Sequence, residues 1–226
     1  MAFAIASLGT PGNTLATQAP TIGPFTPPAN SELFIFASCL AATAPALPTI
    51  SDTLTSSYTA VTSVMGSFNS TNRGRVVRTS IGPSPSIMTV TCDWSASPLP
   101  VNANLFAFAI TGHNAAAPVV ASSNIGTSGG SNATPAAGAA PALANSANMQ
   151  LMFSLARRSA DDSSAKVSPA WTQLGSDTFG TNNDQALFYI IGNYDSAPSC
   201  TLAGAALWWA GTCEIAISAA ANWGAL

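Results

Sequence analysis

Charge is what this sequence lacks most. Only 7% of its 226 residues are Asp, Glu, Lys or Arg, against roughly 25% in an ordinary soluble domain. Six basic and nine acidic residues give a net charge of −3, which provides no basic surface for nucleic acid or for an anionic membrane. A single histidine leaves little material for acid–base catalysis or for a histidine-rich metal site. The composition therefore points to no reaction and no cofactor, and it predicts neither a nucleic-acid partner nor a membrane partner.

Targeting and membrane-spanning segments are also missing. The first ten residues contain no basic segment, and their apolar run ends after eight residues, so we expect no signal peptide. A long charge-free stretch lies between Trp94 and Arg157, but five prolines and many Ser, Asn and Gly residues interrupt it. This stretch is not expected to span a membrane.

The cysteines lack the spacing of a metal or redox site. The four cysteines form no C-x-x-C pair and have no histidine nearby, which argues against zinc binding and thioredoxin-like chemistry. Three of the four lie in apolar alternating runs, so buried free thiols are the prediction, while the pairing of any two in a disulfide stays open. The four are Cys39, Cys92, Cys200 and Cys213.

Strand periodicity is what the sequence does have. From Met88 to Trp94, apolar residues alternate with Thr and Asp, which is typical of a half-buried strand. Sixteen prolines and seventeen glycines interrupt the chain at intervals shorter than a typical helix. We predict an all-β fold, an antiparallel β-sandwich of jelly-roll type, with further strands that are covered on both faces at 33–40, 105–110, 187–191 and 213–217.

Short motifs recur in the same order along the chain. Gly9-Thr10 recurs at Gly126-Thr127, an offset of 126 − 9 = 117, and Ala109-Ile110 recurs at Ala216-Ile217, an offset of 216 − 109 = 107. Two matches between these also recur in order, and the offset shrinks steadily, as loop deletions would make it. This pattern predicts the duplication of a unit of about 105–115 residues.

The predicted repeat leaves two domain organisations. We predict one sandwich unit over residues 1–226, built from pseudo-repeat halves at about 5–114 and 119–218, because no linker separates Ile110 from Val119. Two tandem sandwiches are the alternative.

Several polar motifs suggest chemistry, but each has a simpler structural explanation. Residues 126–130 match the G-x-S-x-G pattern of hydrolases, yet neither a helix nor a later histidine follows Ser128. His113 follows a predicted strand, where a polar turn residue is expected. Asp161-Asp162 and Asn182-Asn183-Asp184 carry oxygen ligands but match no calcium loop, so polar turns are the prediction. We therefore assign no catalytic, cofactor-binding or metal residue, and keep a Ser128 hydrolase as a third hypothesis.

Three arginines form one candidate partner interface. Arg73, Arg75 and Arg78 hold half of the basic charge, and Arg73 and Arg75 share a face if a strand begins there. A charged strand edge that discourages unwanted pairing and a docking patch for an acidic surface are both consistent with this pattern.

Aromatic and N-terminal residues form the other candidate interfaces. Trp208 and Trp209 are adjacent, so only one of them can enter the core of a sheet that is covered on one side, and the other would be exposed or at a subunit contact. An aromatic platform for sugars is the alternative for these tryptophans. The uncharged N-terminus, with Met1, Phe3 and Ile5, is suited to strand pairing with a neighbouring subunit.

The order of motifs resembles one known group of proteins. A Thr-Ile-Ser-Asp segment ending in Tyr-Thr (49–59), a Thr-Val-Thr strand (89–91), a strand ending in Thr-Gly-His-Asn (111–114) and Ala-Trp-Thr-Gln-Leu-Gly (170–175) follow one another. This order resembles the β-sandwich virion proteins of tailed bacteriophages. The sequence departs from their pattern at Ser56-Ser57, where Gly-Asn is usual, and at Asn114, where Asp is usual.

The resemblance implies a structural protein of the virion that is assembled in the host cytoplasm. The first hypothesis is a capsid decoration or cement protein, a homo-oligomer that stabilises the head through contacts with the major capsid protein or other virion proteins. The alternative is a tail-fibre or spike module that binds a host receptor or glycan through an exposed aromatic residue such as Trp208, Trp209 or Tyr194.

Overall fold

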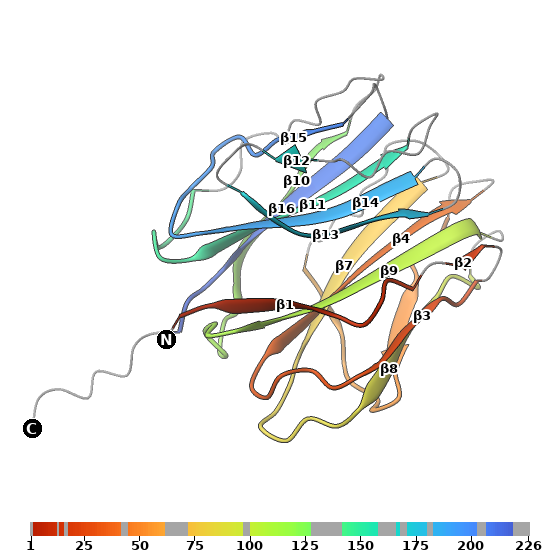
Figure 1. Ribbon diagram of the computed structural model, residues 1–226, viewed down its shortest axis with the longest axis horizontal. Helices are drawn as coiled ribbons and strands as arrows, with labels where there is room; N and C mark the ends of the chain where they lie inside the picture. The colour runs from red at the N-terminus through yellow and green to blue at the C-terminus, as the bar shows by residue number, and fades with distance from the viewer. Residues whose placement is uncertain are drawn as a thin grey trace, which may run out of the picture.

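The protein is described from a computed structural model, and the placed part of the chain consists of antiparallel strands and loops (Figure 1). The predicted all-β, antiparallel sandwich is therefore confirmed. No helix among the placed residues has the length and apolar character needed to cross a membrane. The structure describes residues 2–12, 14–15, 18–41, 45–61, 72–96, 100–127, 142–157, 166–167, 171–179, 183–202 and 207–218.

Two large sheets form the centre of the molecule, one from each half of the chain. The six-stranded sheet has the order β1 (Ala4–Leu8), β9 (Pro100–Thr111), β4 (Glu32–Ala41), β7 (Asn72–Ser80) and β6 (Thr59–Ala60), with β2 (Thr14–Leu15) also paired to β9. The five-stranded sheet has the order β10 (Val119–Thr127), β16 (Leu207–Ile215), β11 (Met149–Arg157), β14 (Asn183–Ile191) and β13 (Thr172–Phe179).

A smaller sheet covers the outer face of each large sheet. Outside the six-stranded sheet lie β3 (Thr21–Phe25), β8 (Met88–Asp93) and β5 (Thr49–Asp52), and outside the five-stranded sheet lie β12 (Lys166–Val167) and β15 (Cys200–Thr201). Figure 1 shows the resulting order of layers, with β12 and β15 at one side and β3 and β8 at the other. Both large sheets are therefore covered on both faces.

This layering explains why the sequences of the central strands are continuous apolar runs rather than alternating patterns. Successive side chains of a strand point to opposite faces, so Phe34 and Phe36 of β4 enter the core between the large sheets, while Leu33 and Ile35 enter the core beneath the small sheet. The ring of Phe36 meets that of Phe153 from the opposite sheet edge-on, with ring centroids 5.4 Å apart. Such aromatic pairs add about 1 kcal/mol beyond the area that they bury.

A buried polar contact also joins the two large sheets. The Ser38 hydroxyl donates to Oε1 of Gln185 over 2.8 Å, and Gln185 Nε2 donates to the Phe36 carbonyl over 2.8 Å. Nearby, Asn104 Nδ2 donates to Asp177 Oδ2 over 3.0 Å. Since a buried polar group is costly when it has no partner, these bonds fix how the sheets are aligned on each other.

The two halves of the chain have the same strand order. The order β1-β9-β4-β7-β6 of the first half corresponds, strand for strand along the chain, to β10-β16-β11-β14-β13 of the second half. The outer pair β5-β8 likewise corresponds to β12-β15. The core between the large sheets draws residues from both halves. The correspondence concerns strand order, while the sequence duplication and the jelly-roll connectivity stay predictions.

Candidate functional site

Strand β7 carries the three arginines, and the alternation of the strand divides them between two faces. Arg73 and Arg75 share the face of Val77, which packs beneath the small sheet, whereas Arg78 lies on the face of Val76, toward the five-stranded sheet. Arg75 Nη1 donates to the Pro48 carbonyl over 2.5 Å. The three arginines therefore do not form a single docking patch.

Arg78 is part of a buried ion pair. Its Nη1 lies 2.5 Å from Oε1 of Glu32, the fully buried first residue of β4. The Ser80 hydroxyl donates to the other carboxylate oxygen, Oε2, over 2.7 Å, and His113 Nε2 lies 3.9 Å from that same atom. Burying a carboxylate costs several kcal/mol unless it is paired and hydrogen-bonded, and here it is both. Our sequence analysis missed Glu32, although a lone acid at the start of an apolar run was a signal.

This cluster contains the residue types of a hydrolase triad but not its arrangement. In a Ser–His–acid triad the imidazole accepts the proton of the serine hydroxyl. Here the Ser80 hydroxyl donates to Glu32, and the carboxylate lies between the serine and the imidazole of His113. The arrangement ties β4, β7 and the segment after β9 together, and it places the carboxylate rather than the imidazole against the Ser80 hydroxyl.

His113 follows β9 as predicted, but its ring is buried and its backbone pairs with the end of the chain. The residue is 7% exposed and forms a β-bridge with Ile217. Asn114 N donates to the Ala216 carbonyl over 2.8 Å beside it. Burial lowers the pKa of His113 below its ordinary value, against the opposing effect of the Glu32 carboxylate and of the Ile110 backbone, which accepts a hydrogen bond from the imidazole. The histidine thus lies where the connection between the halves meets the end of the second half.

The lowered pKa of His113 predicts a pH-dependent stability. Because the unfolded chain takes up this proton at a higher pH than the folded chain, the free energy of unfolding should fall as the pH drops through 6.5 and level off below the folded-state pKa. The slope should not exceed about 1.4 kcal/mol per pH unit. His113 is the only histidine, so His113→Gln should abolish the dependence in urea unfolding between about pH 7.5 and 5. Equal slopes for both proteins would contradict this account.

The adjacent tryptophans are both buried, so the expectation that one of them is exposed is wrong. Trp209 is 1% exposed and lies in the core between the large sheets, where its ring centroid is 6.2 Å from that of Phe36. Trp208 is 5% exposed and lies in the core on the outer face of the five-stranded sheet. The prediction assumed a sheet covered on one side, whereas β16 is covered on both. Neither tryptophan is an accessible interface residue in this chain.

The aromatic platform for sugars, considered as an alternative from the sequence, has no exposed tryptophan among the described residues. Trp94 is fully buried, and Trp171 is 9% exposed and donates Nε1 to Asp195 Oδ2 over 2.9 Å. Tyr194 is 37% exposed, and Trp223 lies outside the described residues.

The N-terminal residues pair within their own chain. Strand β1 runs antiparallel to β9, from Ala4 opposite Thr111 to Leu8 opposite Ala107. Phe3 and Ile5 are half-buried and pack against the core between the large sheets, and Met1 lies outside the described residues. One side of β1 is thus already paired, and its other side is an edge of the six-stranded sheet.

The predicted free thiols are confirmed, since all four cysteines are buried and unpaired. Burial raises the pKa of Cys39 to about 12 and that of Cys200 to about 11, so both stay protonated and unreactive at neutral pH.

The remaining polar motifs form no metal site in the described part of the chain. Asn183 and Asp184 are buried at the start of β14, so they are not part of an exposed turn. No group of His, Cys, Asp and Glu among the placed residues could hold a metal ion. Ser128 and Asp161-Asp162 lie outside the described residues.

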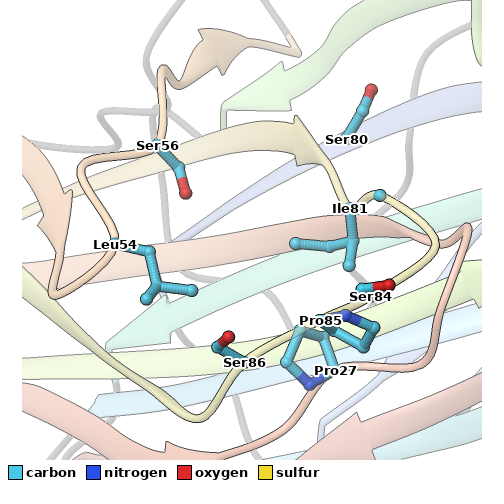
Figure 2. Close-up of a pocket in the computed structure, with 9 residues that line it drawn as sticks. Pro27, Leu54, Ser56, Ser80, Ile81, Ser84, Pro85 and Ser86 are labelled. Carbon is cyan, nitrogen blue, oxygen red and sulfur yellow. The ribbon is translucent and has the colours of Figure 1, made fainter.

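A pocket of about 180 Å³ lies where three loops of the first half meet (Figure 2). The loops connect β3 to β4, β5 to β6 and β7 to β8. Four serines, two prolines, two aliphatic residues and one glycine line the pocket, namely Pro27, Leu54, Ser56, Ser80, Ile81, Gly82, Ser84, Pro85 and Ser86.

Asp52 organises one wall of this pocket. Its Oδ1 accepts hydrogen bonds from the backbone N–H of Leu54 over 2.7 Å and of Ser56 over 3.2 Å, and its Oδ2 accepts one from the Tyr58 hydroxyl over 2.7 Å. Burial acts to raise the pKa of Asp52, but these hydrogen bonds outweigh it and hold the pKa below its ordinary value. The carboxylate is therefore ionised at neutral pH and fixes the loop.

No family model, curated protein or solved structure matches the chain.

Proposed function

We propose that this chain is a non-enzymatic structural protein of a tailed-bacteriophage virion, and specifically a capsid decoration protein that binds other virion proteins and further copies of itself. The architecture supports this proposal. In each half the chain passes back and forth between a large and a small sheet. This alternation is consistent with the predicted jelly roll, a fold that is common in viral capsid domains.

The observation that carries the proposal is the edge of the six-stranded sheet at β1, which pairs on that side with no other strand of the described residues. No charged residue precedes Glu32, so β1 presents an uncharged edge, with Ala4, Ala6 and Ser7 exposed along it. Natural sheets usually protect such edges with charged residues, especially lysine. An unprotected edge suits the addition of a strand from a partner.

The low charge of the chain also favours binding of a partner protein. Charged groups must lose their hydration when a partner covers them, whereas Ala, Ser and Thr lose little. The composition of this chain, with 7% charged residues, resembles that of the buried centre of protein interfaces, where charged residues are depleted.

The alternative function is a tail-fibre or spike module that binds a host receptor or glycan. The structure does not support the first observation on which this alternative was based. It relied on an exposed tryptophan, and Trp208 and Trp209 are buried. Tyr194 is exposed but does not line the pocket between the three loops. The decoration hypothesis therefore has the stronger structural support.

A lysine in β1 tests the role of this edge. Ala6 is exposed and lies in the middle of β1, so Ala6→Lys should leave the fold intact and place a charge where a partner strand would bind. We expect sedimentation velocity to show concentration-dependent self-association of the wild type, and an association at least about tenfold weaker, or ~1.4 kcal/mol, in the variant. Ser95→Lys, at an exposed turn after β8, is the matched control. Equal self-association of all three proteins would exclude the β1 edge as the contact between copies.

A further inference from the structure

The pocket between the three loops combines hydroxyl groups with aliphatic surface. Figure 2 shows the side chains of Leu54 and Ile81 directed toward the space between the loops, with the Ser56 hydroxyl and Ser86 at its border. Ser80 turns its hydroxyl away from this space and donates it to Glu32. Ser84 and Ser86 are exposed, so their hydroxyls are available to a ligand.

The walls of the pocket are held in place before any ligand binds. Thr55 has a φ of 61°, a left-handed conformation that a β-branched residue rarely adopts, and the Asp52 hydrogen bonds on either side maintain it. The loop between β3 and β4 is tied to the loop between β7 and β8 by hydrogen bonds from Asn30 N to the Gly82 carbonyl (3.0 Å) and from Ile81 N to the Ser31 carbonyl (2.8 Å). Left-handed backbone conformations such as that of Thr55 are concentrated at functional sites, where the surrounding structure maintains them.

The chemistry of the lining selects a neutral ligand. None of the nine lining residues is charged. The carboxyl groups that are hydrogen-bonded to lining residues are used within the protein, because Asp52 accepts the loop hydrogen bonds and Glu32 is paired with Arg78. An anionic or cationic ligand would lose its hydration here without gaining a partner of opposite charge.

The size of the pocket limits the ligand further. A volume of about 180 Å³ is smaller than the roughly 300–1,000 Å³ of pockets for drug-sized molecules. It corresponds to about six water molecules of ~30 Å³ each, which is enough for one ring with its substituents. A ring that carries several hydroxyls on one side and C–H groups on its face matches a lining of serine hydroxyls beside proline, leucine and isoleucine.

We propose that this pocket binds a neutral sugar unit, with Ser84 and Ser86 hydrogen-bonded to its hydroxyls and with Leu54 and Ile81 against its C–H face. The site differs from the tryptophan platform considered for the alternative function, and it does not depend on the proposed role in the virion. A single small ring in a half-open pocket makes few contacts with the protein, and the number of contacting atoms limits the binding free energy. The expected Kd is therefore of the order of millimolar.

Amide chemical-shift mapping of the isolated full-length chain tests this site. The probes are glucose, galactose, mannose and N-acetylglucosamine, each titrated to about 10 mM, which is tenfold above a Kd of ~1 mM. We expect at least one of them to shift the amides of the loops at 53–56 and 81–87 in a saturable way. The absence of saturable shifts with all four sugars would overturn the proposal, as would shifts in these loops caused only by an uncharged proline-rich peptide.

Three variants separate sugar binding from a change in fold. Ser84→Arg should fill the pocket and weaken binding at least about tenfold, while Ser51→Arg, the same change at an exposed position on β5, should have no effect. Leu54→Ala removes a side chain that is 44% exposed and should weaken binding a few-fold with an unchanged spectrum elsewhere. If all variants bind like the wild type, the sugar binds elsewhere and the assignment is wrong.

Discussion

The Arg78→Ala variant should be less stable than the wild type by about 3 kcal/mol in its free energy of unfolding. Removing one partner of a buried ion pair leaves the other charge buried and uncompensated, which costs roughly 3–5 kcal/mol. Glu32 is fully buried, but the Arg78 side chain is 23% exposed, so water can partly replace it and the lower value applies. Urea unfolding at neutral pH measures the difference.

Two further variants identify the cause of this loss. Arg73→Ala removes an arginine from the same strand on the opposite face, and should change the free energy of unfolding by no more than about 0.5 kcal/mol. Replacing both partners, with Glu32→Leu and Arg78→Met together, should recover most of the loss, because an apolar pair of similar volume needs no compensation. Equal losses for Arg73→Ala and Arg78→Ala would show that the ion pair does not stabilise the fold.

Replacing Trp209 by alanine should cost about 4 kcal/mol of stability. The side chain lies between the large sheets, 1% exposed and next to Phe36. Removing a large aromatic side chain from a core typically costs 3–5 kcal/mol, because the cavity that remains closes only in part. Thermal or urea unfolding of the isolated chain would measure this loss.

The same variant distinguishes a core residue from an interface residue. If Trp209 served mainly to contact a partner, Trp209→Ala would weaken association and leave the unfolding of the single chain unchanged. We expect the opposite, with an intermediate loss of stability for Trp209→Phe. The matched control is Ile87→Ala, at a side chain that is 63% exposed, and it should be neutral within about 0.5 kcal/mol.

The strands could be predicted from the sequence because each carries a local signal. The alternation from Met88 to Trp94 and the apolar runs of β4, β9, β14 and β16 correspond to strands in the structure. The four-layer arrangement could not be predicted, because it depends on which strands pair over long distances. The assignment of Trp208 and Trp209 failed for this reason, since it assumed one covered face where the fold provides two.

The polar sites were less predictable than the strands. Glu32 and Arg78 are 46 residues apart in the sequence, and only the pairing of β4 with β7 brings them together. The pocket combines three separate loops, each of which looks like an ordinary turn in the sequence. Asp52 was noticed only as part of a motif, yet its carboxylate organises the Leu54–Tyr58 loop. Convergence of this kind leaves no local pattern that a single sequence could reveal.

The central claim is that this chain is a structural component of the virion, bound in many copies to the outside of the head. Quantitative mass spectrometry of purified phage particles, combined with cryo-electron microscopy, tests it most directly. We predict hundreds of copies per particle, with density for the two packed sheets repeated over the capsid surface. A few copies confined to the tail, or absence of the chain from purified particles, would contradict the account.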